Sequence, residues 1–156
     1  EAAGIENVIA LRGDLPQGEN AGPPVKSGFG HASDLIGHIR ENFNFGVAAA
    51  CYPEGHTESL DLDSDMEHTK LRVNQGSDFL VTQLFYDNKY YFDFVDRANK
   101  SGINVPIIPG VLPILSTGQV RRFTALCGAR IPAALDQRLE KFINLGLEGP
   151  CAQPGE

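Results

Sequence analysis

The sequence has few of the residues that mark several protein classes. It contains no tryptophan, one methionine and three cysteines among 156 residues. Cys51, Cys127 and Cys151 are widely and unevenly spaced, which fits neither a zinc ladder nor an even disulfide framework and favours a reducing compartment. We interpret Cys51 as a small buried hydrophobe rather than a reactive thiol.

The sequence also lacks excess positive charge and long apolar runs. Its 13 Lys and Arg against 20 Asp and Glu give a formal net charge of -7, which argues against nucleic-acid binding. No apolar run approaches the roughly 18 to 20 residues that span a bilayer, and the first residues do not resemble a signal peptide. We therefore expect a cytoplasmic protein with neither a membrane nor a nucleic-acid partner. Because the chain starts at Glu1 and its only methionine is Met66, we expect it to be part of a longer protein.

Short β-rich apolar runs alternate with longer amphipathic segments along the chain, as in a parallel sheet with crossover helices. The expected strands cover residues 7–11, 45–52, 79–85 and 105–111. A doubly wound sheet usually carries a glycine-rich phosphate turn after its first strand, and residues 12–14 do not form one. The sequence therefore predicts about four βα units of a (β/α)8 TIM barrel over residues 1–147, followed by a loose Gly/Pro-rich tail over residues 148–156.

Helix signals support this alternation. Ser64 stands three residues before Glu67, the spacing of a capping box. Other expected helix-end residues are Gly76 and Gly102 at C-termini and Ser116 and Pro132 at N-termini. Apolar stripes at helical spacing are formed by Leu35, Ile36, Ile39 and Phe43, by Tyr91, Phe94, Val95 and Ala98, and by Leu135, Leu139, Phe142 and Ile143.

Polar residues gather where the expected strands end. Arg12 to Asp14 follow the first strand, Tyr52 to His56 the second, and Gln83 lies near the end of the third. The reactive groups of (β/α) barrels meet at this C-terminal face. A buried amide without a partner costs about 1 to 3 kcal/mol, so Gln83 predicts a ligand or a hydrogen-bond network.

The same segments carry a family resemblance. The motifs ALRGD, YPEGH, VNQGSDFLVTQLFYD and VPIIPGVLPI occur in this order, with Gln119 and Phe123 downstream. From about Gly4 to Leu139 the chain resembles the methylenetetrahydrofolate reductase family. The resemblance implies FAD-dependent reduction of 5,10-methylenetetrahydrofolate to 5-methyltetrahydrofolate, with NADH or NADPH as reductant and two hydride transfers through one cofactor. It also implies a homo-oligomer when the protein is full length.

The resemblance assigns a role to particular residues. Asp14 is implied as the catalytic residue between flavin and folate, and Asp14, Gln83, Gln119 and Phe123 as folate ligands. His68 and Leu71 stand where many relatives carry other polar cofactor ligands. The family's general acid is a glutamate on a strand that this chain does not contain. The implied cofactor-binding residues are Arg12, Gly13, Asp14, His31, Ala32, Tyr52, His56, Asp65, His68 and Arg72.

The sequence leaves two other interpretations open. In the first, the chain is a non-catalytic remnant, either truncated or pairing with another subunit. In the second it is another flavin barrel oxidoreductase, such as a proline dehydrogenase relative. That enzyme would need a cluster of arginines near the strand ends, and the sequence shows none there.

Overall fold

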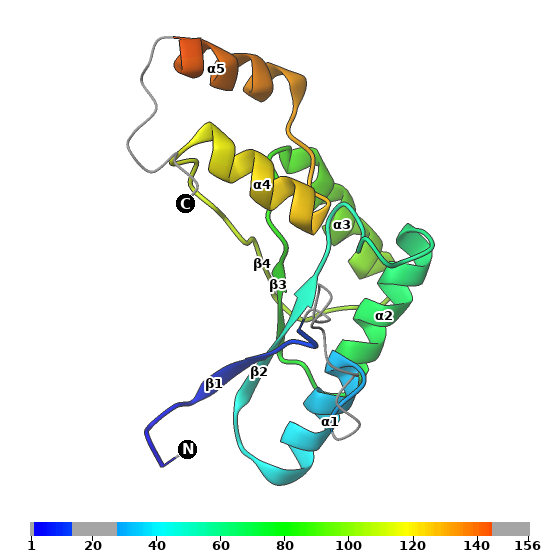
Figure 1. Ribbon diagram of the computed structural model, residues 1–156. Coiled ribbons are helices and arrows are strands. Elements are labelled where there is room, and N and C mark those ends of the chain that lie inside the picture. The colour runs from blue at the N-terminus through cyan, green and yellow to red at the C-terminus, as the bar shows by residue number, and fades with distance from the viewer. Residues whose placement is uncertain (1, 14–27, 145–156) are drawn as a thin grey trace.

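The computed structural model describes residues 2–13 and 28–144 as an α/β chain (Figure 1). Four short strands alternate with helices, and two further helices follow the last strand. The order is β1 (Asn7–Ala10), α1 (Ala32–Asn42), β2 (Gly46–Cys51), α2 (Leu62–Asn74), β3 (Phe79–Thr82), α3 (Asn88–Lys100), β4 (Ile107–Ile108), α4 (Thr117–Cys127) and α5 (Ala133–Asn144).

The four strands form one parallel sheet in the order β1-β2-β3-β4. Each strand pairs with the next one along the chain, with Val8 opposite Val47, Ala49 opposite Leu80, and Leu80 opposite Ile107. Helices α1, α2 and α3 lie on the same side of this sheet (Figure 1). The strand order therefore never reverses, as it would in a doubly wound sheet, and the predicted four βα units of a barrel are confirmed.

The core lies between the sheet and these three helices. Alternate strand residues face the helices, because successive side chains of a strand point to opposite faces. Burial of a large apolar side chain such as Phe94, which is 0% exposed, stabilises the fold by about 1.5 to 3 kcal/mol. The cluster comprises Ala10, Ile36, Val47, Ala49, Cys51, Met66, Leu80, Phe94, Ala98 and Ile103. The interpretation of Cys51 as a buried hydrophobe is confirmed.

The opposite face of the sheet is apolar and partly open. Ile9, Leu11 and Ile108 are 50%, 52% and 47% exposed. In a closed barrel this face packs against the remaining strands.

Helix ends agree with most of the sequence signals. Gly76 and Gly102 have positive φ, as predicted, and the Ser116 hydroxyl accepts the Gln119 N–H. The predicted capping box at Ser64 is wrong, because α2 begins earlier: the Asp61 carboxylate accepts the Ser64 N–H at 2.7 Å. Aspartate is as strong an N-cap as serine. Because Asp61 precedes Ser64 by three residues, α2 is almost one turn longer at its N-terminus than predicted.

The strands are shorter than predicted. β4 has only two residues because Pro106 and Pro109 flank it and have no N–H to donate to a ladder. Phe43 was expected on the apolar stripe of the first helix, but α1 ends at Asn42 and Phe43 is extended and 46% exposed. Asp14, Cys151 and the tail over 148–156 lie outside the described residues. In the part that the structure describes, no helix is long and apolar enough to cross a membrane.

Candidate functional site

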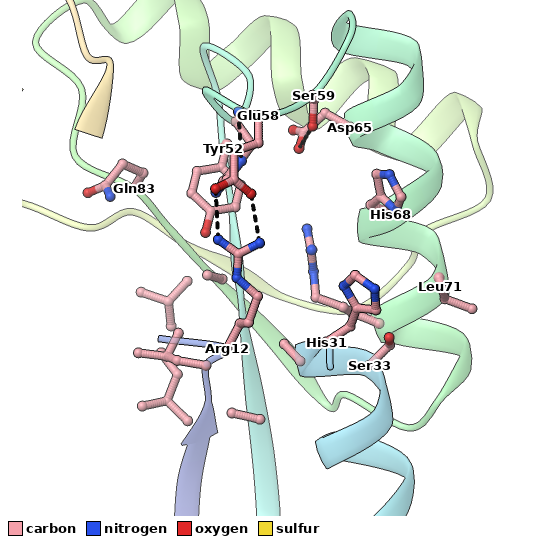
Figure 2. A pocket seen from close by; sticks show the side chains of 18 of the residues that line it. Arg12, His31, Ser33, Tyr52, Glu58, Ser59, Asp65, His68, Leu71 and Gln83 are labelled. Atoms are coloured by element: carbon pink, nitrogen blue, oxygen red, sulfur yellow. Dashed lines mark hydrogen bonds and ion pairs between the residues drawn. The ribbon is translucent and has the colours of Figure 1, made fainter. Parts of the chain in front are cut away.

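A cleft of about 730 Å³ opens where β1, β2 and β3 end (Figure 2). Its walls come from the turn after β1, the start of α1, the loop after β2, one face of α2 and the end of β3. The predicted residues that line it are Arg12, Gly13, His31, Ala32, Tyr52, His56, Asp65, His68, Arg72 and Gln83. Gln119 and Phe123 lie on α4 and do not line it.

An ion pair joins the turn after β1 to the loop after β2 across this cleft. The Arg12 guanidinium donates to both carboxylate oxygens of Glu58, at 2.7 and 3.0 Å, and Figure 2 shows the pair beside Tyr52. The hydrogen bond from Arg12 lowers the pKa of Glu58. Gly13 follows with a φ of 77°, a left-handed conformation that glycine adopts without a steric penalty. Arg12 is therefore fixed at the rim rather than extended into solvent.

The loop after β2 supplies an aromatic wall. The rings of Tyr52 and His56 meet edge to face with centroids 4.6 Å apart. The Nδ1 of His56 accepts the backbone N–H of Glu58 at 3.1 Å, which holds the loop closed on itself. Burial raises the pKa of Tyr52, although the nearby Arg72 opposes the shift, so this phenol stays neutral and can donate a hydrogen bond.

Helix α2 contributes a buried carboxylate and a partly buried cation, Asp65 and Arg72. Asp65 is 3% exposed and accepts a hydrogen bond from the Ser59 hydroxyl at 3.2 Å. Burial raises its pKa, and the charge of Arg72 opposes this rise. Arg72 donates to the Thr69 hydroxyl, and its Nε is buried without a hydrogen-bond partner among the described residues. Such an atom costs about 1 to 3 kcal/mol unless something bonds it, which suits a polar or anionic ligand.

Three of the four histidines of the chain line the cleft. His31 is the N-cap residue of α1, and its backbone N–H donates to Asp34 at 3.0 Å. His68 lies on the exposed side of α2 and faces the cleft in Figure 2. With His56, these side chains add imidazole nitrogens that can bond ribose or phosphate oxygens.

Gln83 follows β3 at the cleft wall. Its backbone N–H donates to the Cys51 carbonyl at 2.7 Å, and its side-chain oxygen accepts the Leu84 N–H at 2.9 Å. The oxygen therefore has one local backbone partner, from the next residue along the chain. Gln83 is only partly buried.

Glu58 and Ser59 are among the lining residues that were not predicted from the sequence. Glu58 pairs with Arg12 across 46 positions of sequence, and Ser59 bonds the carboxylate of Asp65. Both lie within three residues of the end of the YPEGH motif in a strand-to-helix loop, a position that could have marked them as rim residues. No group of His, Cys, Asp and Glu side chains among residues 2–13 and 28–144 is arranged to hold a metal ion.

The sheet and cleft together define part of a (β/α)8 barrel with a polar ligand site at the C-terminal ends of its strands. A solved structure with this fold is described as an uncharacterized protein from Clostridium thermocellum that binds two copies of 5-methyl-5,6,7,8-tetrahydrofolic acid. It aligns with a TM-score of 0.54 and 22% identity, over 75% of this chain and 43% of that chain.

The chain belongs to the methylenetetrahydrofolate reductase family, whose sequence profile matches residues 1–144. It is similar to methylenetetrahydrofolate reductase (NADH) 1 of Arabidopsis thaliana, with 40% identity over 88% of this chain and 25% of that protein. It is also similar to the 5,10-methylenetetrahydrofolate reductase of Escherichia coli K12, with 38% identity over 88% of this chain and 44% of that protein. The chain thus spans about a quarter of its plant relatives and less than half of its bacterial ones.

Proposed function

We propose that this chain forms the flavin-binding part of an enzyme that reduces 5,10-methylenetetrahydrofolate to 5-methyltetrahydrofolate, with FAD as cofactor and NADH or NADPH as reductant. The observation that carries the proposal is that ten residues assigned to the cofactor or the folate line one cleft. They come from five separate segments of a chain that belongs to this family.

The cleft suits a flavin dinucleotide in size and donors. Its volume of about 730 Å³ lies within the range of about 300 to 1,000 Å³ that is usual for ligand sites. The unpartnered Nε of Arg72 would serve a phosphate oxygen, and the buried carboxylate of Asp65 would accept from ribose hydroxyls. The Tyr52 ring would pack on the cofactor, and His31, His56 and His68 would bond its polar chain. When bound, FAD supplies the hydride chemistry itself.

On the folate side, Asp14 would hydrogen-bond the pterin ring and adjust the electron affinity of the flavin by its charge. Gln83 would bond the folate from the end of β3, and Gln119 and Phe123 would approach it from α4. The Clostridium thermocellum protein binds a methylated folate on this fold, which supports a folate ligand. We also propose that the full-length protein is a homo-oligomer.

The test uses the full-length protein. It should purify with flavin absorbance, oxidise a reduced nicotinamide and reduce methylenetetrahydrofolate, and size-exclusion chromatography with light scattering should give an oligomer. Arg72→Gln should weaken flavin binding, whereas Lys89→Gln, which removes an exposed cation of α3, should not. A protein without flavin, or one that oxidises nicotinamide but never reduces the folate, would contradict the proposal.

A further inference from the structure

A buried glutamate connects the loop after β2 to the far end of α4. Glu54 lies within the YPEGH motif, and its side chain is 7% exposed. One carboxylate oxygen accepts the backbone N–H of Arg130 at 3.1 Å, and the other lies 3.7 Å from the Arg130 Nε. Arg130 belongs to the segment between α4 and α5, 76 positions further along the chain. Glu54 thus connects the loop over residues 52–61 (the flavin loop) to a distant segment of the chain.

The loop itself has a separate support. Arg97 of α3 donates to the carbonyl oxygens of Pro53 and Leu62, at 3.3 and 3.4 Å. These two bonds hold the loop at both ends without any help from α4. If the Glu54 contact were lost, the loop would keep its place and α4 would lose an anchor.

Helix α4 and the segment after it have other polar contacts: Arg121 pairs with α5, and the Arg130 guanidinium donates to the Tyr90 hydroxyl at 3.4 Å. Apolar burial on α4 is small among the described residues. Its buried residues are Thr117, Val120 and Thr124, and the Thr124 hydroxyl donates to carbonyls of its own helix. Val120 is the only apolar residue among these three, so burial of this face of α4 gives little hydrophobic stabilisation. Gln119 and Phe123 are four positions apart, so they share another face of the helix, and Phe123 is 38% exposed. The position of that face therefore depends strongly on polar contacts at the ends of α4.

The C-terminal end of α4 approaches the flavin loop closely. Gly128 ends the helix with a φ of 74°, and a Cβ at this position would come within 2.6 Å of the Thr57 methyl group. Tyr52, Glu54, Gln83 and Cys127 line one small void between the two elements. The flavin loop, the end of β3 and the end of α4 therefore meet around Glu54.

We propose that Glu54 is a positioning residue that fixes α4, with Gln119 and Phe123, relative to the flavin loop and so sets how well folate is held against the flavin. The inference rests on the proposed function, because it takes the folate roles of Gln119 and Phe123 from that proposal. Glu54 would touch neither ligand. Its carboxylate positions α4 by accepting the hydrogen bond from the Arg130 backbone N–H.

Three variants of the full-length protein test this. Glu54→Ala removes the acceptor, so KM for the folate should rise about tenfold, the effect of losing one hydrogen bond to a charged group. Flavin affinity and nicotinamide oxidation with an artificial acceptor should not change, because Arg97 still holds the loop. Glu54→Gln keeps an oxygen acceptor and should restore most of the folate affinity. Arg121→Gln breaks the pairs of α4 with Asp136 and Glu140 on α5 and should leave the folate KM unchanged.

Hydrogen exchange gives a readout that is independent of activity. The amides of α4 should exchange faster in Glu54→Ala than in the wild type, with no change in the loop over residues 52–56. A parallel loss of flavin affinity and folate affinity would make Glu54 a structural residue of the loop, and an unchanged folate KM would remove its role altogether. A wild-type protein that binds no flavin would overturn the proposed function, and this inference with it.

Discussion

Replacing Asp65 by asparagine should strengthen the fold and weaken the site at the same time. Asp65 is 3% exposed, and its carboxylate accepts a hydrogen bond from the Ser59 hydroxyl at 3.2 Å. Burial raises its pKa above the ordinary value, against the opposing charge of Arg72. Because the pKa of Asp65 is raised in the folded state, its protonated carboxyl group contributes to the free energy of unfolding, and this contribution is complete below the unfolded pKa. It is lost as pH rises through the folded pKa. Above the folded pKa the ionised carboxylate therefore destabilises the ligand-free protein.

Asparagine removes this penalty and can still accept the Ser59 hydroxyl. Because a buried charge that is only partly compensated costs stability, we expect the free energy of unfolding to increase. The melting temperature of the flavin-free protein should therefore rise. Hydrogen bonds to a charged group contribute about 1.5 to 3 kcal/mol, so the flavin dissociation constant should increase by about 10- to 100-fold.

The measurements are thermal melts of the flavin-free full-length protein at several pH values and a fluorescence titration with FAD. The difference in melting temperature between Asp65→Asn and the wild type should shrink as pH falls toward about 4, where the unfolded carboxyl titrates. A lower melting temperature at pH 7 with unchanged FAD affinity would refute the reasoning and make Asp65 a structural acid.

Asp78→Asn is the matched control. Burial raises the pKa of Asp78, but the hydrogen bonds from the Val47 N–H and Arg40 outweigh it, so the pKa is lowered. This group stabilises the protein above its unfolded pKa and loses that effect as pH falls. Asp78→Asn should therefore destabilise the protein at pH 7. FAD affinity should not change, because Asp78 precedes β3 and does not line the cleft.

Four further predictions concern the proposed site and the chain itself. In the full-length protein, Asp14→Asn should slow folate reduction more than nicotinamide oxidation, and equal slowing in stopped-flow absorbance would count against its role. Gln83→Ala should weaken folate binding with little change in melting temperature, whereas Leu84→Ala should mainly lower the melting temperature. Burial raises the pKa of Cys51 to about 12, so in the native protein a thiol reagent at pH 8 should label Cys127 and leave Cys51 unlabelled until denaturant is added, as peptide mass spectrometry can check. Expressed alone, the 156-residue chain should self-associate and hold flavin weakly, and a monomeric, yellow and active product would contradict this.

The strands, their order and most helix ends were predictable because each depends on nearby residues. Apolar runs located all four strands, and Gly76 and Gly102 marked two helix ends correctly. The start of α2 was not predictable in the same way. Asp61 and Ser64 can both cap a helix. Which of them does so depends on where the loop after β2 ends, and this is set by the fold rather than by the local sequence.

The clustering of the site was predictable, but its internal contacts were not. Parallel strands bring their C-terminal ends to one edge, so ten predicted residues meet in one cleft. The pair Arg12 and Glu58 and the pair Glu54 and Arg130 join segments that only the folded chain brings together. No local pattern distinguishes such glutamates from solvated ones.

The two halves of the proposed site depend on different parts of the chain. All of the cleft lining lies between residues 9 and 83, within three consecutive βα units. Gln119 and Phe123 lie on α4, which follows β4 and is anchored to those units by Glu54. A flavin bound in the cleft would therefore meet a site that the sheet and its packed helices already fix. Folate, in contrast, would be held partly by a helix with little apolar burial, so folate affinity should respond to changes that leave flavin affinity intact.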